Sequence, residues 1–256
     1  MLTNLALEQL LNEKLNAKAI SDYAPNGLQV EGKREIRKII TGVTATLPLI
    51  EKAIEKNADA ILVHHGYFWK SEDPCIRGMK GKRIKQLLVN DINLFGYHLP
   101  LDIHPELGNN AQLAALLGVK HLTGLEDKPY SIPVYGELET AISATELALR
   151  LEKGLNRNII LCDEFVAEFP HKLIKTVAIC TGGGQGYIDL AATKGIDAFI
   201  SGEISEQTTH SAREQGIYYF AAGHHATERY GIKALGEWLA QEYQLDVEFI
   251  DIDNPA

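Results

Sequence analysis

Histidine pairs are the residues of this sequence whose type and spacing point most directly to chemistry. His64-His65 and His224-His225 each follow an apolar run, and His98 follows a third run. Asp102 comes four positions after His98, and Glu228 comes four positions after His224. Imidazole and carboxylate ligands together suit zinc, iron, nickel, manganese or cobalt. The pattern therefore predicts a metal site.

The spacing of the histidines favours two metal ions over one. His64 and His65 are adjacent, so at the end of a strand their side chains point to opposite sides and more easily serve two ions. If a helix begins near Gly223, His224 and Glu228 lie on one face and reach the same ion. Two ions about 3.5–4 Å apart form the standard arrangement for activating water and holding an oxyanion.

Each carboxylate also has an ordinary structural interpretation. Asp102 alone is more often a turn or cap residue, although an extended Leu99-Pro100-Leu101 segment could bring it back to the site. Glu228 alone is more often a first-turn residue favoured by the helix dipole. The metal hypothesis therefore depends on the combination of two histidine pairs with nearby carboxylates.

Apolar periodicity predicts the elements that position these residues. Continuous apolar runs end at the histidines, as in strands covered on both faces, and they alternate with helical patterns. The predicted strands span 36–43, 58–63 and 92–97, and the predicted helices span 2–18, 47–56, 79–90, 111–117 and 144–151. This alternation indicates an α/β fold with mostly parallel or mixed sheets, in which ligands gather beyond the carboxyl ends of the strands.

The chain also repeats itself in a degenerate way. Asp59-Ala60 and Asp197-Ala198 open two similar apolar strands 138 positions apart (197 − 59), and each strand is preceded by a strand, a glycine-containing turn and a helix. We therefore predict two similar α/β halves, 1–125 and 126–256, with a metal site in the cleft between them. The final helix could pack back on the first half.

A second group of polar residues follows strands of the C-terminal half. Thr181-Gly182-Gly183-Gly184 is a turn that either presents backbone N–H groups to a phosphate or lets the backbone approach the metal. Glu203 follows the next strand and, like His98, could shuttle protons if it lies within hydrogen-bond reach of a substrate. His210 has two open interpretations, facing the cleft or the helix surface.

Composition limits the function classes. The net charge of −9 disfavours non-specific nucleic-acid binding, although a local basic patch at Arg77 to Lys85 leaves it open. Three cysteines without paired spacing argue against disulfides and thiolate zinc. The N-terminus has no signal-peptide pattern and no apolar run would span a bilayer, so we expect a cytoplasmic protein without a membrane partner.

Taken together, these motifs resemble the Nif-three-like family, whose members are often labelled "GTP cyclohydrolase 1 type 2 homolog". The resemblance runs from the Ser21–Gln29 loop to the helix of Glu228, and it is closest to the short bacterial form. It implies a dinuclear metal site and a ring-shaped homohexamer. The ligands that it implies are His64, His65, Asp102, His224 and Glu228, with His225 the weaker member of its pair and His98 behind the ligands or facing the substrate.

Two classes of function remain open. The first is a metal-dependent hydrolase that acts on a small, nucleotide-like substrate, with GTP ring opening suggested by the family label. The second is a non-catalytic metal-binding or regulatory scaffold. A DNA-damage-related role through a ring-shaped oligomer is a weaker third hypothesis because of the negative charge.

Overall fold

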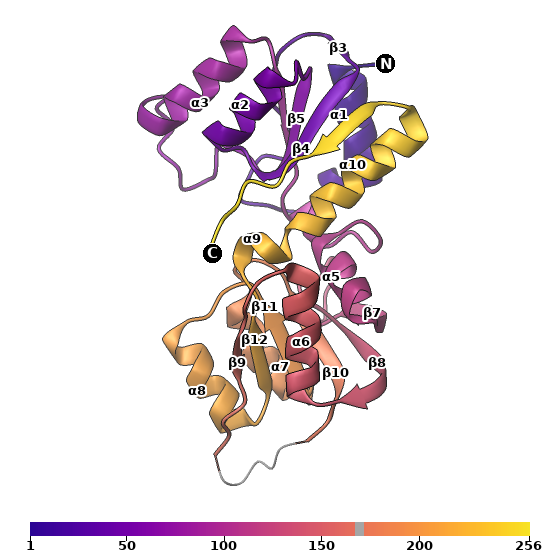
Figure 1. Cartoon of the computed structure of the whole chain (residues 1–256), viewed down its shortest axis with the longest axis vertical. Helices are drawn as coiled ribbons and strands as arrows, with labels where there is room; N and C mark the ends of the chain where they lie inside the picture. The colour runs from indigo at the N-terminus through magenta and orange to yellow at the C-terminus, as the bar shows by residue number, and fades with distance from the viewer. Residues whose placement is uncertain (167–171) are drawn as a thin grey trace. The chain divides into compact units, whose positions relative to one another are not determined.

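The computed structural model describes residues 1–166 and 172–256 (Figure 1). It divides into two units, and each unit contains a main sheet with candidate ligands at or after the ends of its strands. The first unit comprises Met1–Gly108 with Gly231–Asp253, and the second comprises Asn109–Tyr230 with Asn254–Ala256. The two halves predicted from the sequence repeat, 1–125 and 126–256, are defined differently from these units and stay a prediction.

The first unit contains a five-stranded mixed sheet and a small two-stranded one. Its elements are β1 (Leu2–Thr3), α1 (Asn4–Lys14), η1 (Ala17–Ala19), β2 (Gly27–Val30), β3 (Glu35–Ile36), β4 (Lys38–Thr44), α2 (Leu47–Glu55), β5 (Ala60–His65), α3 (Gly78–Val89), β6 (Asn93–Gly96), α4 (Leu99–Asp102), α10 (Arg229–Tyr243) and β13 (Asp246–Phe249). The strand order is β13-β4-β5-β6-β2, parallel except for β2.

Helices cover both faces of this sheet, with α2 and α3 on one side and α1 and α10 on the other (Figure 1). Ala60 and Leu62 of β5 pack into the core under α1 and α10, whereas Ile61 and Val63 pack into the core under α2 and α3. Both faces are therefore apolar, which explains the continuous apolar run in the sequence.

The second unit contains a six-stranded mixed sheet. Its elements are α5 (Asn109–Leu117), β7 (Val119–Gly124), β8 (Val134–Ile142), α6 (Ala144–Leu155), β9 (Ile160–Cys162), β10 (Ile174–Cys180), η2 (Gln185–Tyr187), α7 (Ile188–Thr193), β11 (Ala198–Ser201), α8 (Glu206–Gln215), β12 (Tyr218–Ala221) and α9 (His224–Thr227). The order is β7-β8-β10-β11-β12-β9, and the three strands β10, β11 and β12 are parallel. Helices α5 and α6 cover one face, and α7 and α8 cover the other.

The predicted mixed α/β fold with parallel strands is confirmed. The first helix is shorter than the predicted 2–18, because the Thr3 side chain caps its N-terminus at the Ala6 N–H and Asn16 adopts a left-handed conformation after its end. Strand β5 begins and ends two residues later than the predicted 58–63, so it includes both His64 and His65. Every helix within the described residues is too short or too polar to cross a lipid bilayer.

The parallel cores of the two sheets share one register. Ile39 pairs with Ala60 in the first sheet, and Val177 pairs with Ala198 in the second, so both partners are shifted by 138 positions (177 − 39 and 198 − 60). The duplication of the chain stays a proposal, which this shared register supports.

The aspartates before β5 and β11 bind the start of the neighbouring strand in the same way. Asp59 Oδ2 accepts the N–H groups of Arg37 and Lys38 at 2.8 and 2.9 Å, and its Oδ1 pairs with Lys33. Asp197 Oδ2 likewise accepts two N–H groups, those of residues 175 and 176, at 3.0 and 2.9 Å. Each carboxylate thus satisfies backbone donors that would otherwise lack a partner at the amino end of a central strand.

Burial on its own would raise the pKa of Asp197, but hydrogen bonds from Lys172 and from the strand hold this pKa below its ordinary value. The pKa of Asp59 is lowered in the same way, against burial, by Lys33 and two N–H groups. Because the folded-state pKa values lie below the unfolded ones, the stabilisation is present above the unfolded pKa of about 3.9 and is lost as the pH falls through the folded value.

We therefore expect Asp59→Asn and Asp197→Asn each to lower the free energy of unfolding by about 1.5–3 kcal/mol at pH 7, the usual range for hydrogen bonds to a charged group. The difference from the wild type should shrink below about pH 3, where the aspartate is protonated in both states. Urea denaturation at the two pH values measures it. Asp127→Asn, at an exposed ion pair with Lys194, is the matched control and should change little. Equal losses at both pH values would contradict the electrostatic account.

Candidate metal centre

Strand β5 delivers two imidazoles to the carboxyl end of the first sheet. The ring centroids of His64 and His65 lie 4.4 Å apart. The His98 ring, after β6, lies 5.1 Å from that of His64 and 5.8 Å from that of His65. Each of these three histidines offers a ring nitrogen within 4.8 Å of those of the other two. The first unit by itself therefore gathers three nitrogen donors that can hold a metal ion.

The contacts of His64 determine which of its nitrogens faces the site. Its Nδ1 lies 3.0 Å from the carbonyl oxygen of Tyr97, and its Nε2 lies 3.5 Å from Oδ1 of Asp102. A carbonyl oxygen only accepts hydrogen bonds, so Nδ1 carries a proton and Nε2 is the nitrogen that faces the Asp102 carboxylate. Nε2 of His64 and Oδ1 of Asp102 both carry lone pairs, so at 3.5 Å they attract each other only if a cation, either a proton or a metal ion, lies between them.

Asp102 reaches His64 by a route that differs from the predicted one. The segment after His98 is not extended but forms the single helical turn α4, with Pro100 in its first turn. The N–H groups of Leu101 and Asp102 donate to the carbonyl of His98 at 2.8 and 3.2 Å. The prediction of an extended segment was wrong, because proline with its fixed φ is well suited to the first turn of a helix. One turn still returns Asp102 to the carboxyl end of the sheet.

His98 is tied to a buried carboxylate that the sequence did not identify as part of a site. Its Nδ1 lies 2.9 Å from Oδ1 of Asp22. Burial would raise the pKa of Asp22, but His98, Asn26 and the Leu99 N–H bind the carboxylate and lower this pKa to about 2. Asp22 is therefore charged at neutral pH and orients the His98 ring. The signal available in the sequence was an aspartate four residues before Asn26 in a loop rich in turn residues.

His65 is oriented by the neighbouring strand. Its Nδ1 lies 3.2 Å from the hydroxyl of Thr44, its register partner on β4. The ring is half-buried, whereas His64 is 1% exposed. Pairing of β4 with β5 thus holds His65 through a residue that belongs to the sheet itself.

In the second unit, His224 lies between two carboxylates. Its Nδ1 is 2.7 Å from Oε1 of Glu203, and its Nε2 is 3.4 Å from Oε2 of Glu228. Helix α9 begins at His224, so Glu228 lies one turn further on, as the spacing predicts. The Glu228 side chain is 3% exposed, while that of Glu203 is 46% exposed. The arrangement repeats that of His64: one nitrogen is held by an acceptor and the other faces a buried carboxylate.

The backbone of the glycine turn after β10 lies directly against His224 and Glu228. Gly182 has a φ of +64°, and a Cβ at this position would overlap Oε1 of Glu228 and lie 3.1 Å from Nε2 of His224. Its N–H donates to the Thr227 hydroxyl at 3.0 Å, and the Gly184 N–H donates to Ser201 at 3.0 Å. These donors are bound within the protein, which favours the interpretation of a tight turn beside the site over a phosphate-binding loop.

Two further histidines are placed elsewhere in the second unit. His225 is buried on α9, and its backbone N–H donates to the carbonyl of Ala256 at 3.2 Å. His210 is exposed on α8. Of its two open interpretations, exposure favours the helix surface.

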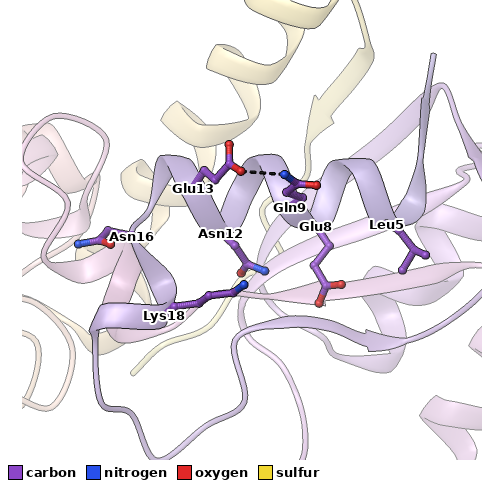
Figure 2. A pocket seen from close by; sticks show the side chains of 7 residues that line it. All are labelled: Leu5, Glu8, Gln9, Asn12, Glu13, Asn16 and Lys18. Carbon is purple, nitrogen blue, oxygen red and sulfur yellow. Dashed lines mark hydrogen bonds between the residues drawn. The ribbon is translucent and has the colours of Figure 1, made fainter.

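A polar hollow of about 410 Å³ lies along α1 in the first unit (Figure 2). Its lining residues are Leu5, Glu8, Gln9, Asn12, Glu13, Asn16 and Lys18. The set contains no histidine, and the Gln9 side chain donates to Glu13 one turn further along α1 at 2.9 Å. The hollow therefore differs in chemistry from the imidazole cluster.

The fold and these clusters define an α/β protein whose buried histidine, aspartate and glutamate side chains can hold a metal ion at the carboxyl ends of parallel strands. More particularly, the chain belongs to the Duf34/NIF3 (NGG1p interacting factor 3) family, whose model matches residues 3–255. The resemblance inferred from the motifs is thereby confirmed.

Relatives of this chain match it over its whole length. A Pasteurella multocida protein named "GTP cyclohydrolase 1 type 2 homolog" is 72% identical over 252 residues, covering 98% of this chain and 99% of its own. A Haemophilus influenzae protein of the same name is 70% identical over the full length of both. Among solved structures, protein ybgI, described as of unknown function, is 59% identical with a TM-score of 0.94 and complete coverage of both chains. A Thermus thermophilus structure is 32% identical with a TM-score of 0.87, also with complete coverage of both chains.

Gly182→Ala tests the close approach of the turn. A side chain should cost about 1–2 kcal/mol through the left-handed backbone conformation and displace the Glu228 carboxylate. Thermal unfolding and the metal retained after dialysis measure the two effects. Gly186→Ala is the matched control, because a Cβ there meets no atom within 4 Å. If the two variants behaved alike, the packing of Gly182 against Glu228 would not matter.

Proposed function

We propose that this protein binds two divalent metal ions and uses them to hydrolyse a nucleotide-like substrate. The proposed ligands are His64, His65 and Asp102 of the first unit and His224 and Glu228 of the second. The observation that carries the proposal is the pairing of a histidine Nε2 with a buried carboxylate oxygen in each unit, at 3.5 Å for His64 and 3.4 Å for His224.

The donor set fits such ions on chemical grounds. Imidazole nitrogens and carboxylate oxygens suit zinc, iron, manganese, nickel and cobalt. Metal-binding histidines in proteins usually donate their second N–H to a carboxylate or carbonyl, which fixes the ring and makes the ligating nitrogen more basic. His64 has this support from the Tyr97 carbonyl, and His224 has it from Glu203. Gly182 adds a side-chain-free surface beside Glu228.

Bound metal ions would supply Lewis acidity and water activation at neutral pH. The chain's own residues orient the ligands and handle protons. Glu203 holds Nδ1 of His224 through Oε1 and lies 3.2 Å from Gln185 Nε2 through Oε2, so it is well placed to orient this ring. His98 is held at Nδ1 by Asp22, and we propose that its Nε2 holds or accepts a proton at the substrate. Both residues thus remain candidates for proton transfer.

The nature of the substrate is inferred from the relatives. The name of these relatives points to GTP, whose purine ring would be opened by hydrolysis. We also propose a homohexamer, as the family resemblance implies. Light scattering coupled to size-exclusion chromatography tests the oligomer independently of the chemistry.

Asp102→Asn and Glu228→Gln test the ligands of the two units. Each removes a charge with little change in shape, so we expect bound metal to fall from about two ions per chain while the fold is retained. Metal analysis after dialysis, with circular dichroism for the fold, measures both. Asp127→Asn and Glu139→Gln are the matched controls at exposed ion pairs. Unchanged metal content in both ligand variants would contradict the proposed site.

Turnover is tested separately. Wild-type protein loaded in turn with zinc, iron, manganese, nickel and cobalt is incubated with GTP and other nucleotides, and products are separated by chromatography. We expect turnover with at least one metal, and a loss of at least about 100-fold in the two ligand variants, because the water-activating ion is removed. Stoichiometric metal binding without turnover of any nucleotide would instead support a non-catalytic metal-binding role.

A further inference from the structure

Beside the three imidazoles of the first unit lies an aromatic pair, Tyr23 and Trp69, that the metal ligands do not account for. The two ring centroids are 5.7 Å apart, with 37° between the ring planes. Both rings meet His98 edge to face, Tyr23 at 5.0 Å and Trp69 at 4.9 Å. Trp69 also lies 5.9 Å from the ring of His65. The aromatic pair is therefore continuous with the candidate metal ligands.

The aromatic pair is not part of a hydrophobic core. Tyr23 is 55% exposed and Trp69 is partly exposed, and neither belongs to the apolar clusters under the helices. Large aromatic rings gain free energy when they are buried, so two rings in contact that stay partly exposed beside a polar cluster are a feature of binding sites.

Local hydrogen bonds hold the two loops that carry the rings. The Lys70 N–H donates to the carbonyl of Tyr23 at 2.8 Å, which joins one loop to the other. The Tyr23 N–H donates to Oδ1 of Asp22 at 2.7 Å, and the Trp69 indole N–H donates to the carbonyl of Gly66 at 3.2 Å. The backbone at Tyr23 and the indole ring of Trp69 are therefore held in position before any ligand arrives, which lowers the entropic cost of binding.

The backbone beside Trp69 carries strain. Phe68 has a φ of +64°, a left-handed conformation that is an outlier for a bulky residue. The carboxylate of Glu72 accepts the N–H groups of Phe68 and Trp69 at 2.8 and 3.2 Å and so stabilises this turn. Strain of this kind persists where the surrounding structure over-determines it, and it clusters at ligand-binding sites.

We propose that Tyr23 and Trp69 bind the planar heteroaromatic ring of the substrate by stacking, next to His98. The inference rests on the proposed function and names the substrate class: a compound with a planar, nitrogen-containing ring such as a nucleobase. Aromatic faces stack on every nucleobase, so this surface selects for a planar ring but does not distinguish one base from another by hydrogen bonds. Selection between bases would come from other groups.

Fluorescence of Trp69 tests the proposal directly. The sequence has two tryptophans, so Trp238→Phe leaves Trp69 as the only one. In this background, GMP, AMP and UMP are titrated, with ribose 5-phosphate as the matched compound without a base. We expect at least one nucleotide to quench Trp69 and ribose 5-phosphate not to do so. Equal quenching by ribose 5-phosphate, or no quenching by any nucleotide, would overturn the proposal.

Substitutions of Tyr23 in the same background test the second ring. Tyr23→Leu should weaken nucleotide binding by about 5- to 100-fold, the range for loss of one stacked ring, whereas Tyr23→Phe should restore it. Tyr130→Leu, at a tyrosine that is 49% exposed in the second unit, is the control for loss of a surface ring. Unchanged affinity in Tyr23→Leu would count against stacking.

Metal content separates this inference from the proposed function. The titrations are repeated on chelator-treated protein, and metal per chain is measured for every variant. Retained metal with lost nucleotide affinity in Tyr23→Leu supports stacking. Stacking of nucleotides by a protein that binds no metal would refute the metal-dependent hydrolase and leave the aromatic site standing. Metal binding together with unchanged nucleotide affinity in Tyr23→Leu would refute stacking and leave the proposed metal site standing.

Discussion

The orientation of two histidine rings is the constraint on which the candidate site depends. An imidazole has two nitrogens, and an acceptor that binds one as N–H determines what the other presents. The Tyr97 carbonyl does this for His64, and the Glu203 carboxylate does it for His224. In both cases the remaining nitrogen faces a buried carboxylate at about the same distance, 3.5 and 3.4 Å. Such pairs need a cation to be stable, since burial removes the water that would otherwise solvate the charge.

The sheets supply the rigid frame for these rings. Neighbouring parallel strands, four in the first unit and three in the second, end at the same edge of their sheet. In the first unit this edge carries His64 and His65 at the end of β5 and His98 after β6, and in the second it carries His224 after β12. Asp59 and Asp197 bind backbone donors at the opposite edge. The strands are thus held at their amino ends by carboxylates and carry the candidate ligand residues at their carboxyl ends.

The aromatic pair lies directly beside the imidazoles of the first unit. His98, which is held by Asp22, contacts both Tyr23 and Trp69, so one residue joins the candidate metal site to the proposed stacking surface. The loops that carry the rings are fixed by their own backbone hydrogen bonds.

The sequence by itself determined the α/β class, the order of strands and helices around the site, and the histidines and carboxylates that end them, because apolar periodicity and local spacing are properties of consecutive residues. The sequence predicted that Asp102 returns to His64, but it predicted an extended backbone between His98 and Asp102. Instead, Pro100 lies in the first turn of the short helix α4. The partners of the rings were decided by tertiary structure alone. Asp22 lies 76 positions from His98, and Glu203 lies 21 positions from His224. No local pattern reports which distant acceptor will bind Nδ1 of a histidine, because that contact exists only once strands and loops far apart in the chain have packed together.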